Sequence, residues 1–431
     1  MDLATCSMRV DLPRGFVPRY NGGEFEDQLS GLSGALWFYS RTLGCEGSAT
    51  FMFGGLDIDH YFPEDAVPPR SSSNRIEPVE RTGITAVSAG HGYYFHHKGK
   101  GSWRQQRALQ NGIVEDDITP AYASELKSLL ETRGSRTVHR MRSTSVEQHE
   151  DSGHPWWQMS ARYHLAFLLP EHPAIWHSLP NATGHLRERD EDIRSRPLYA
   201  NHLAADELIH VHTNGVDDTT TRGTRVIYHA TKPQDIPLAA SILCYMRELI
   251  TGQPGYEAFE VAATPHSGRQ GENRLANMPS VIVETAFHSN PEDALALQDP
   301  VFRTASMKGV EKGYRLFLEG QACTPLKVLP IERIELVAGE ERAIELQVEG
   351  FPRYPAVIAT ENVLCPPGWV CTGGKVHLPD ATSKKPHIKV SCQNAGSAPI
   401  VWQTQMVDDD GARSPPVKHV VQCLRRPGAF G

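Results

Sequence analysis

Two histidines and two glutamates in the sequence have the types and positions of a hydrolytic metal site. His91 stands between two glycines just after an apolar run, and His212 closes another apolar run. Glu284 ends the run that starts at Met278, and Glu115 follows a loop. In a catalytic zinc site, two histidines and one carboxylate bind the metal while water takes the fourth position. A second carboxylate then acts as general base or acid, so these residues predict a zinc-dependent catalytic site.

Each of these residues taken alone also fits an ordinary structural role. A histidine between glycines is common in turns, and a glutamate at a helix start compensates the helix dipole. Glu284 alone fits a solvated carboxylate at the mouth of a buried strand equally well. The segment HEDSGH at 149–154 is excluded as a zincin motif, because its histidines are five positions apart and Gly153 and Pro155 would break a helix. The prediction therefore depends on a fold that brings the four residues to one edge.

Strand and helix patterns alternate between residues 82 and 321. We expect six strands in this region, at 84–88, 137–141, 208–212, 225–230, 259–263 and 278–283. Such alternation implies an α/β fold with a mixed, mostly parallel sheet flanked by helices. Sites in these sheets form outside the carboxyl ends of the strands. His91, His212 and Glu284 fall at three expected strand ends, and the loop before Glu115 can return to the same rim.

Helix signals follow two of the candidate site residues. A helix is expected to start at or just after Glu115, where apolar residues recur at helical spacing. Pro120 fits such a helix only in its first turn. Asn290 can cap a further helix that begins at Pro291. These two helices would anchor the segments that carry Glu115 and Glu284.

The regions on either side of this α/β pattern contain no cluster of ligand-type residues. Residues 1–80 are expected to form a small β-rich N-terminal region, with aromatic runs at 33–40 and 48–55 and a linker composition at 68–74. Short strands separated by turns predict a C-terminal β-sandwich domain. The expected organisation is therefore an N-terminal region at 1–80, a catalytic domain at 82–321 with an insert at 139–200, and an accessory domain at 325–431.

Composition and charge exclude several classes of function. The chain has 431 residues, 39% of them hydrophobic and 22% charged, as is usual for a globular protein, and its net charge is -8. This acidic balance leaves no basic excess for phosphates, so a nucleic-acid partner is not expected. No run of about 18 apolar residues exists, so no transmembrane segment is expected. The N-terminus lacks the basic start and apolar core of a signal peptide, which we take to be absent from this chain.

Four of the eight cysteines lie in the last part of the chain. Cys365 and Cys371 flank a tight Pro-Pro-Gly loop that suits a local bridge, and Cys392 and Cys423 lie in two expected strands. The sequence has no CxxC pair that would indicate a cysteine zinc site. We therefore favour disulfides over buried free thiols, and with them an extracytoplasmic location, periplasmic or secreted.

The region from about 84 to 318 resembles the zinc-dependent N-acetylmuramoyl-L-alanine amidases of type 3, which have a carboxypeptidase-like α/β fold. Four segments carry the resemblance in the family's order, namely AGHG at 89–92, GIVEDDIT at 112–119, ADELIHVHTN at 205–214 and MPSVIVETAFHSNPED at 278–293. The resemblance implies that His91, Glu115 and His212 bind zinc and that Glu284 is the catalytic carboxylate.

The same segments imply roles for two neighbouring residues. Asn214 matches the asparagine of the family's His-x-Asn motif and is expected to bind substrate. His210 is not expected to be a ligand, because the following histidine matches the motif. The implied reaction is hydrolysis of the amide between the lactyl group of N-acetylmuramic acid and L-alanine of the stem peptide, with peptidoglycan as the substrate.

The chain also departs from a minimal member of this family. Glu115 and His212 are 97 positions apart (212 minus 115), and the excess is the insert at 139–200, which could form a wall or lid. The segment 214–237 is too short for the inhibitory helix that some division-linked relatives carry. Two other interpretations stay open: a zinc carboxypeptidase or other peptidase on a similar fold, and a metal-free wall-binding protein.

Overall fold

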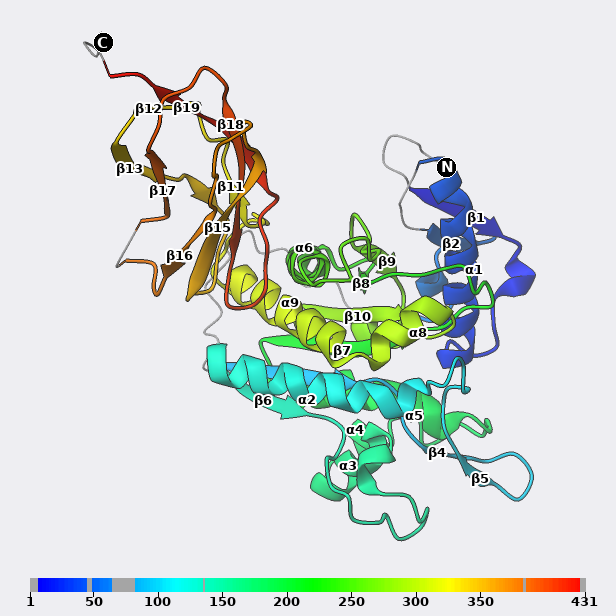
Figure 1. Ribbon diagram of the computed structural model, residues 1–431. Coiled ribbons are helices and arrows are strands. Elements are labelled where there is room, and N and C mark those ends of the chain that lie inside the picture. Colours follow the sequence, from blue (N-terminus) through cyan, green and yellow to red (C-terminus); the bar gives the residue numbers. More distant parts are fainter. Residues whose placement is uncertain (1–6, 45–48, 64–81, 135, 383–384, 427–431) are drawn as a thin grey trace, which may run out of the picture. The chain divides into compact units, whose positions relative to one another are not determined.

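The computed structural model describes residues 7–44, 49–63, 82–134, 136–382 and 385–426 (Figure 1). The chain divides into two compact units, one of residues 1–246 with 259–321 and the other of residues 247–258 with 322–431. The first unit contains the candidate site residues. The linker composition at 68–74 lies outside the described residues.

A six-stranded sheet forms the centre of the first unit. Its strand order is β6-β3-β7-β10-β8-β9. Every neighbouring pair is parallel except β10 with β8, which is antiparallel. The expected mixed, mostly parallel sheet is therefore confirmed. Its strands are β3 (Ile84–Ala89), β6 (Thr137–Arg140), β7 (Glu207–Asn214), β8 (Arg225–His229), β9 (His266–Gly268) and β10 (Ser280–Phe287).

One of the six expected strands is wrong. Residues 259–263 do not form a strand, and only Val261 makes an isolated bridge, to Thr224. The sixth strand is instead the three-residue edge strand β9. A strand this short at a sheet edge buries little apolar surface, so the sequence carries no alternating pattern to mark it.

Helices cover both faces of this sheet. Side chains alternate along β3, so Thr85 and Ala86 point to opposite faces. The Thr85 hydroxyl lies 2.6 Å from the Tyr314 hydroxyl of α9, and Ala86 packs in a buried cluster with Ala200 of α5. The helices of this unit are α1 (Gly23–Thr42), α2 (Glu115–Gly134), α3 (Ala161–Leu168), α4 (Pro173–Trp176), α5 (Arg187–His202), α6 (Ile236–Thr251, whose last turn belongs to the second unit), α7 (Gly271–Arg274), α8 (Pro291–Gln298) and α9 (Pro300–Leu318).

Helix α2 starts at Glu115 as expected, but Pro120 lies beyond its first turn. A proline at this position leaves the carbonyl of Asp116 without its helical N–H donor. The Arg142 side chain replaces that donor, with Nη1 2.9 Å from the Asp116 carbonyl oxygen. Arg142 is fully buried and also donates to the carbonyls of Gly90, Trp157 and Met159. The helix therefore tolerates Pro120 because a distant side chain satisfies the backbone.

The N-terminal region is less β-rich than the sequence suggested. Strand β1 (Met8–Leu12) pairs in parallel with β2 (Ala49–Phe53), which lies in the aromatic run expected at 48–55. The strand expected at 33–40 is wrong, because these residues belong to the 20-residue helix α1. Phe25, Leu29 and Leu36 recur on one face of α1 and pack against the aromatic side chains of β2. Helical spacing thus outweighs the strand preference of the aromatic residues.

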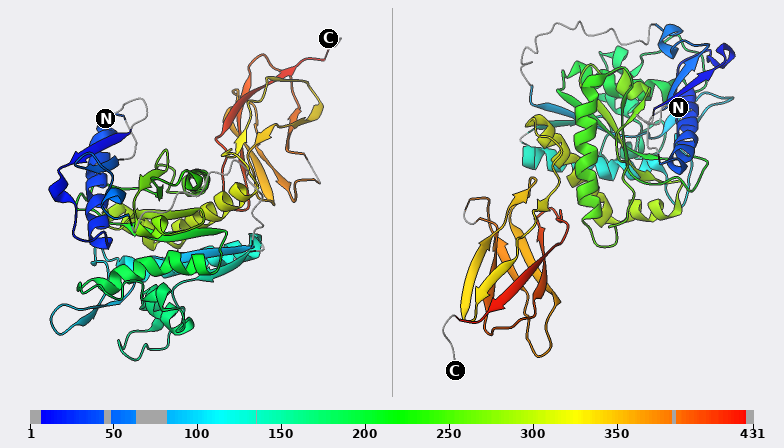
Figure 2. Two further views of the ribbon diagram at one scale, coloured as in Figure 1. Left: turned by 180° about the vertical axis from the view of Figure 1, so that it is seen from behind. Right: turned by 90° about the horizontal axis from the view of Figure 1, so that it is seen from above.

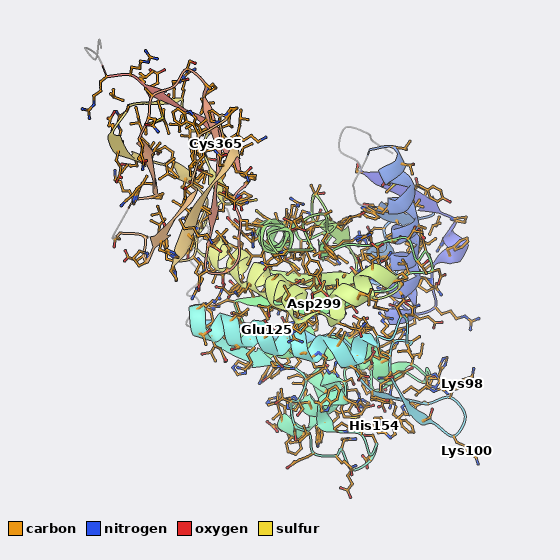
Figure 3. The ribbon with its side chains drawn as sticks, viewed as in Figure 1. Lys98, Lys100, Glu125, His154, Asp299 and Cys365 are labelled. Carbon is orange, nitrogen blue, oxygen red and sulfur yellow. A yellow bond between two sulfur atoms is a disulfide. The ribbon has the colours of Figure 1, made fainter. Side chains whose placement is uncertain are left out.

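The insert at 139–200 contains the helices α3 and α4 and most of α5, which ends just beyond the insert at His202. Before it, a small hairpin pairs β4 (Tyr94–His96) with β5 (Ser102–Arg104). Lys98 and Lys100 lie in the turn of this hairpin (Figure 3).

The second unit has the expected β-sandwich (Figure 2). A five-stranded sheet of order β12-β19-β18-β15-β16 packs against the pair β13-β17 around a buried apolar core. Both expected bridges are present, Cys365 with Cys371 (Figure 3) and Cys392 with Cys423. The strands are β11 (Lys327–Val328), β12 (Ile334–Val337), β13 (Glu340–Glu345), β14 (Val348–Glu349), β15 (Ala356–Leu364), β16 (Gly374–Leu378), β17 (His387–Cys392), β18 (Ile400–Val407) and β19 (Val417–Leu424).

None of the helices in the described part of the chain is long and apolar enough to span a membrane.

Candidate active site

Neighbouring strands of the central sheet bring the candidate residues to one edge. Glu284 of β10 pairs in register with His212 of β7, and His91 follows the end of β3, which is the other neighbour of β7. Gly90 lets the His91 segment pass close to β7, because a Cβ built on Gly90 would lie 2.5 Å from His212 Nδ1. His91 itself has a φ of 62°, a backbone conformation that residues other than glycine rarely adopt.

His91, Glu115 and His212 form one compact buried group. His91 Nε2 lies 3.5 Å from Glu115 Oε2, and His212 Nδ1 lies 2.9 Å from Glu115 Oε1. Glu115 reaches the group as the first residue of α2, where the backbone N–H of Thr213 also donates to Oε1 at 3.1 Å. The donor atoms of these three residues lie within 4.8 Å of one another. The structure therefore brings together the three residues that the sequence selected as metal ligands.

The orientation of both imidazole rings fits a metal centre. Each histidine points one nitrogen at Glu115, and its other nitrogen has a separate partner. His91 Nδ1 lies 3.0 Å from Gln106 Oε1, and His212 Nε2 lies 3.1 Å from Glu272 Oε2. Histidines that bind metal ions through one nitrogen are typically held by such a contact at the other. The group thus has the donor set and the outer contacts of a site that could bind a metal ion.

The charges around this group shift the pKa values of its members in opposite directions. Burial alone would lower the pKa of His212, but the adjacent Glu272 and Glu115 carboxylates raise it to about 10. Burial and the nearby guanidinium of Arg107 hold the pKa of His91 well below its usual range. Burial alone would raise the pKa of Glu115, but its contacts with His212 and Arg107 lower it below the ordinary value. His91 is therefore neutral and Glu115 ionised at neutral pH, which are the forms that bind metals.

Glu284 lies beside this group at a break in the β7–β10 ladder. The strand does not end at Glu284 as the sequence suggested, because β10 continues to Phe287 with a register shift between the two residues. Burial raises the pKa of Glu284 to about 7. Its Oε2 atom is buried and has no hydrogen-bond partner among the residues that the structure describes. This carboxyl is therefore poised to exchange a proton near neutral pH.

A pocket of about 300 Å³ opens onto these residues. His91, Glu115, His212 and Glu284 all line it. Residues of helix α1 also line the pocket. This helix (blue) crosses one end of the central sheet, the end at which β10 finishes (Figures 1 and 2). The candidate residues are therefore grouped on the wall of a cavity that a small part of a substrate can enter.

Helix α1 is tied to the pocket by acidic residues near its N-terminus. Asp27 binds the Arg107 guanidinium through two hydrogen bonds of 2.9 Å each. Arg107 Nε in turn lies 3.1 Å from His91 Nε2 and 3.4 Å from Glu115 Oε2. Glu26 forms an ion pair with Arg274 and accepts the backbone N–H of Gly271, next to Glu272. The N-terminal region thus contributes directly to the surroundings of the candidate ligands.

Two further predicted assignments concern β7. Asn214 lies at the end of this strand and lines the pocket. His210 is fully buried and forms a second possible ligand group with His212 and Glu272. His210 is absent from the pocket lining, whereas all three residues of the first group line the pocket. The group of His91, Glu115 and His212 is therefore the better candidate for a metal site that a substrate can reach.

Sequence reasoning missed Gln106, Arg107 and Glu272. Gln106 and Arg107 lie in a loop, and Glu272 lies in the four-residue helix α7. None of them ends an apolar run or has a motif of its own. The only available hint was their position just before the segments that carry Glu115 and Glu284.

Comparisons with known proteins identify the family of this chain. A sequence model of the N-acetylmuramoyl-L-alanine amidase family matches residues 86–314. Among curated proteins, no sequence matches the chain. Solved structures that match the chain include the catalytic domain of CwlV, an N-acetylmuramoyl-L-alanine amidase from Bacillus (Paenibacillus) polymyxa var. colistinus. The two sequences are 16% identical, the TM-score is 0.37, and the match covers 55% of this chain and 98% of that one.

Two other structures are similar to the same extent. The CwlD amidase from Clostridioides difficile, solved in complex with the GerS lipoprotein, has 17% identity and a TM-score of 0.39, covering 55% of this chain and 99% of that one. The amidase Ami1 from Mycobacterium smegmatis has 17% identity and a TM-score of 0.35, covering 56% and 99%. Since the family match alone spans more than half of the 431 residues, the chain belongs to the N-acetylmuramoyl-L-alanine amidase family.

Proposed function

We propose that this amidase hydrolyses the bond between the lactyl group of N-acetylmuramic acid and L-alanine of the peptidoglycan stem peptide at the pocket described above. The proposal assigns zinc binding to His91 Nε2, Glu115 and His212 Nδ1. It assigns the transfer of protons to Glu284. The observation that carries it is the convergence of these four side chains on one pocket wall.

The protein residues prepare the site in three ways. His91 and Glu115 are held in their metal-binding protonation states, and Glu115 fixes the position of His212 Nδ1. Held by these residues, zinc would supply polarisation of the substrate carbonyl and would lower the pKa of a bound water to about 7. The largely buried surroundings strengthen these electrostatic interactions, since water screens them less.

Glu284 is proposed to take a proton from the attacking water and to return it to the leaving amine nitrogen. A general base works best when its pKa lies near the operating pH, and burial raises the pKa of Glu284 to about 7. Its Oε2, which accepts no hydrogen bond from the described part of the chain, is available for such a transfer. Asn214, which lines the same pocket, is proposed to bind the substrate.

The location and the domain roles are also proposals. The two disulfides between residues 365 and 423 support an extracytoplasmic location, because such bonds persist in oxidising compartments. We assign catalysis to residues 82–321, with the insert at 139–200, and an accessory role to the β-sandwich of residues 325–431.

Product analysis of digested peptidoglycan tests the activity against the peptidase alternative. Purified protein is incubated with murein, with and without a chelator, and the products are identified by mass spectrometry. The proposal expects intact stem peptides that start with L-alanine, and expects none after chelation. Peptides cut between amino acids would indicate a zinc peptidase instead. Unchanged murein together with a protein that binds no zinc would favour the metal-free wall-binding protein.

A further inference from the structure

The outer nitrogens of the two candidate zinc histidines are held by residues from different parts of the chain. His91 Nδ1 contacts Gln106 Oε1, which lies in the loop after β5. His212 Nε2 contacts Glu272 Oε2, which lies on α7. Taken separately, these are two ordinary contacts of the kind that orient a metal-binding histidine.

A continuous set of buried contacts joins these two partners through helix α5. The Gln106 amide Nε2 donates to Asp192 Oδ2 at 2.8 Å. Arg196, one turn further along α5, donates to the same Asp192 oxygen and, through its other terminal nitrogen, to Glu272 Oε1. Asp192 and Arg196 are both fully buried, so water does not compete for these contacts.

This connectivity determines which nitrogen of His91 is protonated. Gln106 uses its amide N–H group on Asp192, so only its carbonyl oxygen faces His91. An amide oxygen only accepts, so His91 Nδ1 must be the protonated nitrogen. The lone pair of His91 is then on Nε2, which faces Glu115. Asp192, which does not touch His91, thereby supports the same tautomer that the donation from Arg107 Nε to His91 Nε2 requires.

The other end of the network orients His212 through an ion pair. Glu272 Oε2 lies 3.1 Å from His212 Nε2, while His212 Nδ1 lies 2.9 Å from Glu115 Oε1. Arg196 balances the negative charges of both Glu272 and Asp192. A buried carboxylate is costly unless it is paired, so each member of the network depends on its neighbours.

From these contacts we propose that Asp192 and Arg196 of α5 are positioning residues that couple the two zinc histidines, through Gln106 to His91 and through Glu272 to His212. The inference rests on the proposed zinc site. It assigns a function to α5: the helix links the outer partners of both rings. A break anywhere in the network should then disturb zinc binding at both histidines.

Zinc affinity tests this coupling independently of catalysis. The full chain and its variants are titrated with Zn²⁺ against a chromophoric chelator. Gln106→Ala and Glu272→Gln should each weaken zinc binding by about 10- to 100-fold, the usual effect of losing an outer partner. In the double variant, the fold-loss of zinc affinity should be clearly smaller than the product of the two single fold-losses, because either change already breaks the shared network. Asp192→Asn, which touches neither histidine, should weaken binding to a similar extent.

The control is Glu191→Gln on the same helix. Glu191 is fully buried like Asp192, but it pairs with Arg162 and His177, which contact neither of the two candidate zinc histidines. This variant should bind zinc within about twofold of the wild type, because it lies outside the network. In addition, the visible absorption spectrum of chain saturated with Co²⁺ should change in Glu272→Gln and Asp192→Asn but not in Glu191→Gln, since it reports the positions of the ligands.

The outcomes separate the inference from the proposed function. If the wild type binds no zinc, or His91→Ala binds it as tightly, the zinc site is wrong and the inference falls with it. The wild type could bind zinc while the fold-loss of zinc affinity in the double variant equals the product of the fold-losses in Gln106→Ala and Glu272→Gln. In that case the inference alone is overturned. Unchanged binding in Asp192→Asn overturns it equally.

Discussion

Glu284 and His212 are directly paired across the parallel strands β10 and β7. Sheet pairing therefore sets the separation between the proposed proton carrier and a proposed zinc ligand. The register shift just after Glu284 releases the following residues from this ladder. Glu284 thus stays next to the ligand group without belonging to it.

Replacing Glu284 with glutamine should separate metal binding from turnover. Glu284→Gln keeps the size of the side chain but removes the group that accepts a proton. We expect the zinc content to be unchanged and murein hydrolysis to fall by about 100- to 10,000-fold. Zinc is measured by elemental analysis and turnover by release of stem peptides. Normal hydrolysis by this variant would show that Glu284 does not carry the proton.

The same substitution predicts a pH-dependent change in stability of the metal-free protein. The pKa of Glu284 rises from 4.5 to about 7 on folding, so the folded state binds more protons than the unfolded state between these pH values. The free energy of unfolding of the wild type therefore falls as the pH rises through this window. The Glu284→Gln variant has no titrating group at this position, so its free energy of unfolding does not fall for this reason. At pH 8 the variant should be more stable by at most about 3 kcal/mol.

Thermal unfolding in excess chelator at pH 4 and pH 8 measures this difference. The two proteins should unfold at similar temperatures at pH 4, and the variant should unfold at the higher temperature at pH 8. A variant that is less stable at pH 8 would contradict the raised pKa of Glu284.

Loss of either proposed histidine ligand should remove zinc. In His91→Ala and His212→Ala, two ligands remain where three are needed for a stable site. We expect zinc content near zero by elemental analysis of the folded, soluble fraction. His210→Ala is the matched control, since His210 lies on the same strand and is fully buried but is absent from the pocket lining. Zinc retained by His91→Ala, or lost from His210→Ala, would favour the second ligand group instead.

Arg107 is expected to oppose cation binding. Its Nε lies 3.1 Å from the His91 nitrogen that is assigned to zinc, so its positive charge repels the ion. Replacement by Gln removes this charge, and zinc affinity should increase by roughly tenfold. Arg189→Gln is the control, because Arg189 also contacts Asp27 but does not contact His91. Weaker zinc binding in Arg107→Gln would mean that Arg107 supports the site.

The two disulfides of the β-sandwich should differ in their contribution to stability. Cys392 and Cys423 are 31 positions apart, whereas Cys365 and Cys371 are only 6 apart. The larger loop loses more entropy when it is closed in the unfolded chain, by about 1.5 kcal/mol in the simplest treatment. Replacing both cysteines of the longer bridge with alanine should therefore lower the unfolding midpoint more than the same change at the shorter one. Zinc content serves as the control and should be unaffected by either change.

The parts of the fold that could be predicted are those with strong local patterns. The strand residues that lead to His91, His212 and Glu284 are buried within the sheet, so they appear in the sequence as apolar runs followed by a polar residue. Asn290 caps α8 as its sequence indicated, accepting the backbone N–H groups of Glu292 and Asp293. In each case neighbouring residues alone determine the local structure.

The network around the histidines could not be predicted, because its members meet only after folding. Gln106 and Asp192 are 86 positions apart, and Arg196 and Glu272 are 76 positions apart. A charged residue in a helix ordinarily faces solvent, so nothing in the sequence marks Asp192 and Arg196 as buried. The aromatic run at 33–40 misled for a different reason, since its composition favours a strand while its spacing favours a helix.

Arg142 has a consequence for the evolution of this chain. It lies in the insert at 139–200, yet it binds the carbonyl that Pro120 leaves unpaired in α2 and the carbonyl of Gly90 beside His91. Excision of the insert would leave the Asp116 carbonyl buried without this donor, at a cost of about 1 to 3 kcal/mol. It would also remove one of the two side-chain donors to the Gly90 carbonyl, which would keep only the Thr119 hydroxyl. The insert is therefore not an interchangeable module grafted onto a finished enzyme. A shortened descendant or an engineered chimera would first have to repair the helix that presents Glu115.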